Sequence, residues 1–284
     1  MSRLALALIW LVHFLPLRVI ARIGDAIGWL LFWLIAERRR VTRINLEKCF
    51  PQKSPQERER IARGHFRAIC RAFAQHGIFW WSPPARIQKI VTVEGREHLP
   101  ADSRVVIFAP HFVGQEGAVM RMSLDIPIAS MYSRQKDPAF DARLLAGRRR
   151  FGGTIFPRQA GFRQAVKQIK AGKYYYFMPD LDFGPQGAVF VPFFGVPAAT
   201  ATGLAFIARV GKAVVVPCVS RLLPDGRYLA KFYPPWRDFP TGDDVADARR
   251  MMAFVEERIL EMPEQYLWMH KRFKTRPPGE PRFY

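Results

Sequence analysis

The chain has 284 residues, of which 49% are hydrophobic, and its 44 Lys and Arg against 24 Asp and Glu leave a net charge of +20. This length suits one α/β domain with a full core, and the hydrophobic share excludes both a disordered chain and a polytopic membrane protein. The charge predicts an anionic partner: nucleic acid, anionic lipid or an acidic protein. Seven Trp and 23 Phe are many for a nucleic-acid-binding protein, and they favour an anionic membrane surface.

Two apolar runs lie near the N-terminus, at residues 4–17 and 26–36, with two arginines and an aspartate between them. Neither run reaches the roughly 20 residues of a spanning helix, and no small-residue cleavage site follows the first, so a removed signal peptide is not expected. The arginines at 38–40 are typical of the cytoplasmic membrane face. Residues 1–40 are predicted to anchor the chain, as one tilted spanning helix or as two interfacial helices. A buried hairpin of a soluble protein is the alternative.

Residues 41–284 have the pattern of a single α/β domain. Ser54-Pro55-Gln56-Glu57 has the residues of a capping box with proline at the first helical position, which predicts a helix to about His76. Beyond residue 90, strands and helices alternate, and this predicts a sheet flanked by helices with reactive groups where strands end. The expected strands are 90–94, 104–109, 127–132, 174–178, 189–193, 213–220 and 228–232; the expected helices are 114–124, 138–150, 160–171, 200–210 and 243–261.

The cysteines and most of the histidines carry no signal for a site. Three scattered cysteines, Cys49, Cys70 and Cys218, are interpreted as reduced thiols facing a cytosol. No Cys/His spacing is typical of a metal site, so neither a metal nor a cofactor is expected. No role is assigned to the histidines without a carboxylate at a telling distance, which are His13, His65, His76 and His98.

His111 and Glu116 form the candidate catalytic pair, directly after the strand expected at 104–109. Within one continuous helix they would lie about 140° apart, at roughly 100° per residue, and could not meet. With His111 on the turn and Glu116 in the first helical turn, the carboxylate can reach the imidazole. This geometry predicts a general base oriented by an acid. The spacing alone leaves open a loop histidine that is merely hydrogen-bonded.

The His-x4-Glu pattern after a short strand resembles the glycerolipid acyltransferase superfamily. Further segments resemble specifically the late acyltransferases of lipid A biosynthesis, the lauroyl and myristoyl transferases. These segments are Arg43-Ile44-Asn45-Leu46 with Cys49-Phe50-Pro51, residues 178–185 with 191–195, and residues 263–277. The resemblance spans most of the chain. It implies a glycerolipid-acyltransferase-like α/β fold, with a central mixed sheet flanked by helices and N-terminal hydrophobic membrane-anchoring helices.

The resemblance also implies an activity in lipopolysaccharide biosynthesis. A fatty acyl chain would move from acyl carrier protein, the co-substrate, to a hydroxyl of a lipid A precursor of the Kdo-lipid IVA type. His111 would act as the general base and Glu116 would stabilise the imidazolium, without a covalent acyl-enzyme. The enzyme would lie at the bacterial inner membrane with its catalytic domain facing the cytoplasm.

Five further residues are expected to bind substrate. Arg158 lies where the superfamily places an arginine that holds the acceptor's phosphate or polar head, a task that suits the guanidinium fork. Asp180 lies where glycerol-phosphate relatives carry a glutamate. Asp180 and Asp182 either bind sugar hydroxyls or cap the turn at Gly184. Arg148 and Arg150 belong to a basic run that either contacts phosphate or forms a solvated helix face.

The net charge fits two anionic substrates, acyl carrier protein and the phosphorylated glycolipid, at a membrane surface. One alternative is an acyltransferase of the same superfamily that acts on another glycolipid or on an aminolipid. A more distant alternative is a basic, membrane-attached nucleic-acid-binding protein. No nucleic-acid partner is expected, because the sequence contains no recognisable nucleic-acid-binding module.

Overall fold

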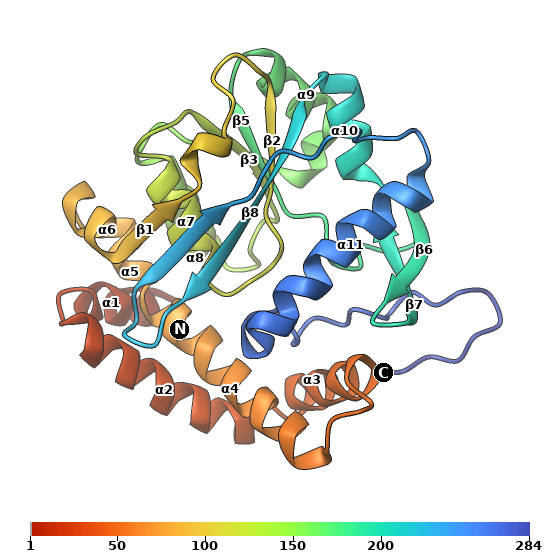
Figure 1. The fold of residues 1–284 in the computed structure, drawn as a ribbon. Helices are drawn as coiled ribbons and strands as arrows, with labels where there is room; N and C mark the ends of the chain where they lie inside the picture. Colours follow the sequence, from red (N-terminus) through yellow and green to blue (C-terminus); the bar gives the residue numbers. More distant parts are fainter. Residues whose placement is uncertain (1) are drawn as a thin grey trace.

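A seven-stranded sheet with the order β1-β9-β8-β2-β5-β3-β4 lies at the centre of the structure, a computed structural model that describes residues 2–284 (Figure 1). Neighbouring strands are parallel except β8 and β9, so the sheet is mixed, as expected. A separate antiparallel hairpin joins β6 to β7. The strands are β1 Val91–Glu94, β2 Val105–Phe108, β3 Ile128–Tyr132, β4 Thr154–Pro157, β5 Tyr174–Phe177, β6 Ala188–Phe193, β7 Val196–Ala201, β8 Val214–Leu222 and β9 Tyr228–Phe232.

Two strands, β4 and β7, were not predicted from the sequence. β4 is a four-residue edge strand that ends in proline, and such a short run carries little periodicity. β7 contains Pro197 and three alanines, which have low strand propensity, and its register comes from pairing with β6. The helix expected from residue 200 therefore begins later, at Gly203. The extended conformation of both strands therefore depends more on pairing with a neighbouring strand than on the strand propensity of their own residues.

Helices cover both faces of the sheet (Figure 1). Val106 and Phe108 of β2 belong to one core cluster and Val105 and Ile107 to the other, because successive side chains of a strand point to opposite faces. Helices α9 to α11 pack on the first face and α5 to α8 on the second. The helices are α1 Ser2–Val12, α2 Leu17–Leu34, α3 Ala36–Cys49, α4 Pro55–Ala74, α5 His76–Trp81, α6 Pro84–Ile90, α7 Gln115–Met122, α8 Pro138–Arg149, α9 Gly161–Lys170, α10 Gly203–Gly211 and α11 Asp244–Glu261.

The capping box predicted before α4 is confirmed. The backbone N–H of Glu57 donates to the Ser54 hydroxyl at 3.2 Å, and the backbone N–H of Ser54 donates to the Glu57 carboxylate at 2.8 Å. Both bonds satisfy N–H groups that a helix start leaves without partners. Helix α4 ends at Ala74 and α5 begins at His76. The buried residues of α5 belong to the same core cluster as one face of β2.

Helix α2 packs on α4 and leaves its other face exposed. A Cβ added at Gly24 or Gly28 would come within 2.5 or 2.6 Å of the α4 backbone, so glycine permits this close approach. Of the twenty large hydrophobic residues exposed among those described, twelve lie between residues 4 and 35. They are Leu4, Leu8, Trp10, Leu11, Phe14, Val19, Ile27, Trp29, Leu30, Trp33, Leu34 and Ile35.

By length and composition, no individual helix within residues 2–284 qualifies as a membrane span. Helices α2 and α3 qualify only as a pair, and the chain bends by 91° between them.

His65 of α4 is fully buried, and its Nδ1–H donates to the Glu264 carbonyl at 3.1 Å. Burial lowers its pKa from 6.5 to about 4. Below pH 6.5 the unfolded chain therefore binds a proton that the folded chain rejects, so acid destabilises the fold. At about 1.4 kcal/mol per pH unit, acidification to about pH 5 should cost about 2 kcal/mol of unfolding free energy through His65.

Urea unfolding of wild type and His65→Gln, at about pH 7.5 and about pH 5, measures this contribution. We expect the variant to lose less stability on acidification than wild type. His98→Gln, at a partly exposed histidine, controls for the substitution itself. Equal losses in wild type and His65→Gln would show that His65 is not the acid-sensitive group.

Candidate active site

His111 and Asp180 meet at the carboxyl edge of the sheet. They follow β2 and β5, which are parallel neighbours, so the loops after both strands lie together. The ring Nδ1–H of His111 donates to Asp180 Oδ1 at 2.7 Å, and the backbone N–H of His111 donates to Oδ2 at 3.0 Å. With its proton held on Nδ1, the ring presents Nε2 as the basic nitrogen.

The Asp180 carboxylate is completely buried. Burial by itself would raise its pKa, but attraction to His111 and the two hydrogen bonds from His111 outweigh burial and hold the pKa below its usual range. Asp180 is therefore ionised at neutral pH. A buried carboxylate on Nδ1 orients an imidazole and stabilises its protonated form, as in acid–base enzymes generally.

The C-terminal segment supports this pair. Leu267 N–H donates to the His111 carbonyl at 3.1 Å, and Phe112 forms an isolated β-bridge with Tyr266. The Tyr266 hydroxyl donates to the backbone carbonyl of Asp180 at 3.4 Å. Residues 263–277, one of the segments that carried the resemblance, thus contact the loops that carry His111 and Asp180.

Asp182 takes the turn-capping role that the sequence had left as one of two alternatives. Its carboxylate accepts from the Gly184 N–H at 2.9 Å, and from the N–H and hydroxyl of Thr275 at 2.7 and 2.9 Å. The side chain is almost fully buried. Asp182 therefore stabilises the loop after β5 and attaches it to the C-terminal segment.

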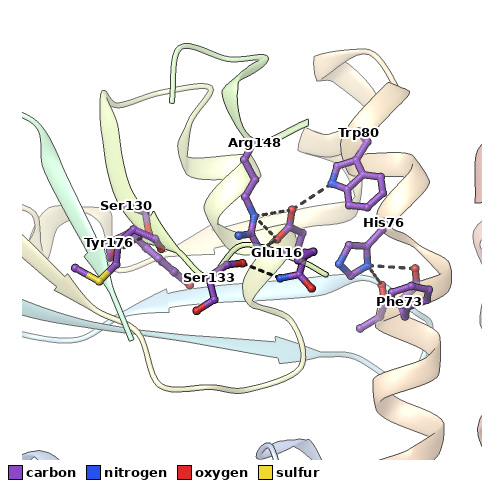
Figure 2. Close-up of polar contacts among 11 residues, drawn as sticks. Phe73, His76, Trp80, Glu116, Ser130, Ser133, Arg148 and Tyr176 are labelled. Carbon is purple, nitrogen blue, oxygen red and sulfur yellow. Dashed lines mark hydrogen bonds and ion pairs between the residues drawn. The ribbon is translucent and has the colours of Figure 1, made fainter. Parts of the chain in front are cut away.

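Glu116 lies in the first turn of α7, as predicted, but its carboxylate pairs with Arg148 of α8. Arg148 Nη2 and Nε donate to Oε2 at 2.6 and 3.0 Å, and Trp80 Nε1 donates to Oε1 at 3.2 Å. Figure 2 shows Arg148 and Trp80 converging on Glu116. Burial favours the neutral acid, but Arg148 outweighs it and keeps the pKa of Glu116 below its usual range.

The carboxylate that contacts the His111 ring is thus Asp180, and the contact expected from Glu116 is corrected accordingly. The reason is topological. Helix α7 turns Glu116 toward α5 and α8, whereas β5 lies directly beside β2 and delivers its own loop to the imidazole. A spacing of five residues could suggest the first arrangement but carries no information on which strand neighbours β2.

Two cavities share His111 and Arg148 in their linings. The larger, about 490 Å³, is mostly apolar and aromatic and also receives Arg158. The smaller, about 200 Å³, lies between α4 and the start of α7 and is lined by Phe73, His76, Glu116 and others. Rings and apolar side chains of the larger cavity include Leu144, Phe162, Phe177, Met178, Phe183 and Phe206.

The two remaining arginines differ in position. The Arg158 guanidinium lies 4.5 Å from the centre of the Phe183 ring and lines the larger cavity, where it can reach a bound anion. Arg150 instead donates to the Phe79 carbonyl at 3.2 Å and stacks on Phe151. Arg150 is not among the residues that line the two cavities at His111, and its contacts support the α5–α8 packing.

His76 is a site residue that sequence reasoning missed. Its Nδ1–H donates to the carbonyls of Ala72 and Phe73 at 2.9 and 3.1 Å, so Nε2 is the nitrogen without a proton (Figure 2). Burial lowers its pKa despite the nearby Glu116. It lines the smaller cavity beside Glu116 and Arg148. In the sequence it lies forty residues from Glu116, with no motif linking the two.

Among the described residues, no group of three or more His, Cys, Asp or Glu side chains could hold a metal ion. The three cysteines are all free and buried.

The model of the family described as bacterial lipid A biosynthesis acyltransferase matches residues 2–275. The chain belongs to this family. A lipid A biosynthesis lauroyltransferase of Escherichia coli K12 is 35% identical over 287 residues, covering 99% of this chain and 94% of the relative. A myristoyltransferase of the same organism is 34% identical, covering 92% of this chain and 82% of the relative.

The chain is therefore an acyltransferase of lipid A biosynthesis. Among solved structures, it is similar to the 1-acyl-sn-glycerophosphate acyltransferase of Thermotoga maritima, with a TM-score of 0.42 and 18% identity. That alignment covers 84% of this chain and 97% of the other.

Proposed function

We propose that this enzyme transfers a fatty acyl chain from an acyl carrier protein thioester to a hydroxyl of a phosphorylated lipid A precursor of the Kdo-lipid IVA type. The observation that carries the mechanism is the His111–Asp180 pair. Its Nδ1 contact leaves Nε2 as the base, and His111 lines two cavities large enough to receive parts of both substrates.

In the proposed reaction, His111 Nε2 removes the hydroxyl proton while that oxygen attacks the thioester carbonyl carbon. The tetrahedral intermediate collapses, the carbon–sulfur bond breaks, and the imidazolium returns its proton to the departing thiolate. The products are an ester and a free thiol, and no covalent acyl-enzyme forms. Asp180 stabilises the imidazolium and keeps the ring oriented throughout.

Glu116 contributes through Arg148 in this mechanism. The ion pair holds the guanidinium at the boundary of both cavities, where its remaining N–H groups can reach a phosphate or the developing oxyanion. Glu116 would thus act on the reaction through Arg148, in place of the direct contact with the His111 ring that the sequence predicted.

Membrane attachment through α1 and α2 accounts for their exposed apolar face. Trp10, Trp29 and Trp33 lie among the aliphatic side chains of this face, and tryptophan prefers the membrane interface. Arg38 and Arg40 of α3 are exposed next to it and can pair with anionic headgroups. We place the enzyme on the cytoplasmic side of the bacterial inner membrane, where a glycolipid acceptor can enter laterally.

The function is tested by supplying acyl carrier protein thioester with a lipid A precursor and, separately, with other glycolipid or aminolipid acceptors. Mass spectrometry should detect one added acyl chain on the lipid A precursor alone. His111→Ala should abolish the product while the circular dichroism spectrum stays that of wild type. Acylation of a different acceptor only, or full turnover by His111→Ala, would refute the assignment.

Arg158→Ala should raise the KM for the acceptor by roughly tenfold to a hundredfold, because a charge-assisted hydrogen bond to phosphate is lost. The KM for the thioester should change little. Arg158→Lys keeps the charge but not the fork, so we expect an intermediate KM. Steady-state kinetics with each substrate varied in turn measures both constants. An acceptor KM that stays at the wild-type value in Arg158→Ala would remove this residue from the phosphate site.

A further inference from the structure

A basic stripe runs along α9 and continues onto α10. Arg163, Lys167 and Lys170 are exposed and lie at i, i+4 and i+7, which places them on one side of α9. Helix α10 packs against α9 and ends in the exposed Arg209 and Lys212. We call these five residues the α9–α10 stripe.

The stripe is not neutralised by the protein itself. Asp244 lies 3.5 Å from Arg209, but across residues 2–284 none of the other four cations takes part in an ion pair. The surrounding sequence explains this, because residues 142–179 contain nine Lys or Arg and no Asp or Glu. Uncompensated cations on one face favour association with a partner of opposite charge.

The stripe begins at the mouth of the larger cavity. Phe162 in the first turn of α9 and Phe206 of α10 both line that cavity, are partly exposed, and lie with ring centres 5.8 Å apart. Val210, also exposed, continues this apolar strip between the cations. A partner seated on the stripe would thus contact apolar side chains beside the entrance to His111.

The position of the stripe favours a protein over a lipid surface. Figure 1 shows α9 and α10 at the top of the molecule and α1 and α2 at the bottom, with the sheet between them. Most of the large hydrophobic residues that are exposed among those described lie in the segment of α1 and α2. A bilayer that receives this face lies on the other side of the molecule from α9.

We propose that the α9–α10 stripe is the docking surface for acyl carrier protein, an acidic protein that brings the thioester to the larger cavity. This inference rests on the proposed function, since it specifies where the donor binds. An acidic helix of the carrier would lie along the stripe, and its thioester-bearing arm would enter the larger cavity beside Phe162 and Phe206 toward His111.

The test uses the full-length enzyme with Lys167→Glu and Lys170→Glu combined. With acyl carrier protein thioester as the varied substrate, KM should rise about tenfold at low salt, and kcat should stay within about twofold of wild type. The increase should shrink as salt is added, because the interaction is between exposed charges. The same acyl group carried on pantetheine, without the protein, should be used equally by variant and wild type.

The matched control combines Arg60→Glu and Lys89→Glu, which makes the same charge change at exposed cations on α4 and α6. Its KM for the carrier thioester should equal that of wild type. An equal KM in both double variants would overturn the docking surface. Lower thermal stability of the α9 variant with an unchanged KM would overturn it too, and would show that these lysines only stabilise the helix end. A wild-type enzyme that takes no acyl group from carrier protein would instead refute the proposed function.

Discussion

Asp180→Asn should lower kcat by about 10³-fold to 10⁴-fold with little change in either KM. The amide has nearly the same shape but carries no charge, so it cannot stabilise the imidazolium formed when His111 takes the hydroxyl proton. Its NH₂ group would also face either Nδ1 or the backbone N–H of His111, both of which donate to Asp180 in the wild type. The expected result is a loss of the correct tautomer as well as of charge. Single-turnover kinetics with acyl carrier protein thioester measures the chemical step directly.

Titration of Asp180 itself should not appear in the pH dependence of the reaction near neutral pH, because the contacts with His111 hold the pKa of this carboxyl below its usual range. Asp182→Asn is the matched control, since it changes a buried carboxylate two residues away that binds Thr275 and Gly184. We expect Asp182→Asn to reduce stability more than kcat. If Asp180→Asn retained wild-type kcat, the Asp180 contact would be structural only and another group would have to orient the base.

Glu116→Ala should reduce both activity and stability, by about 10²-fold or more in kcat and by about 3 kcal/mol in unfolding free energy. The removal leaves the Arg148 guanidinium in a largely buried position without its carboxylate, and an uncompensated buried charge is costly. Arg148 would also lose its orientation at the two cavities. Denaturant unfolding and steady-state kinetics measure the two effects.

The double variant Glu116→Ala with Arg148→Ala separates these two effects. Removing both charges should restore part of the stability, because no buried charge is left unpaired. Activity should stay low, because the guanidinium that lines both cavities is gone. Recovery of activity together with stability would show that the pair serves only the fold.

Acid unfolding provides a second check on this pair. The pKa of Glu116 lies below 4.5 in the folded protein, so its contribution to stability is present above pH 4.5 and is lost as pH falls through the folded pKa. The double variant should lack this part of the acid sensitivity. If the double variant lost as much stability at acid pH as wild type, the pKa of Glu116 would be the same in the folded and unfolded chains.

Local sequence signals predicted those helices and strands whose formation depends on residues a few positions apart. The capping box before α4 placed the helix start correctly, because its hydrogen bonds join residues three apart. The strand before His111 and the helix that begins next to Glu116 were also predicted, since their hydrophobic pattern and turn residues lie within a few positions. β4 and β7 were missed because their conformation depends on strands elsewhere in the chain.

The sequence by itself determined the family, the α/β class, the apolar N-terminal segment and His111 as the candidate base, because each depends on a motif or on composition. Only the tertiary structure decided that Asp180, 69 residues away, holds the His111 ring, that Glu116 binds Arg148, and that His76 joins the site. The physical reason is strand order: β5 lies directly beside β2 although β3 and β4 separate them in sequence. That neighbour relation is set by packing across the whole sheet, so it brings Asp180 to His111 where local spacing pointed to Glu116.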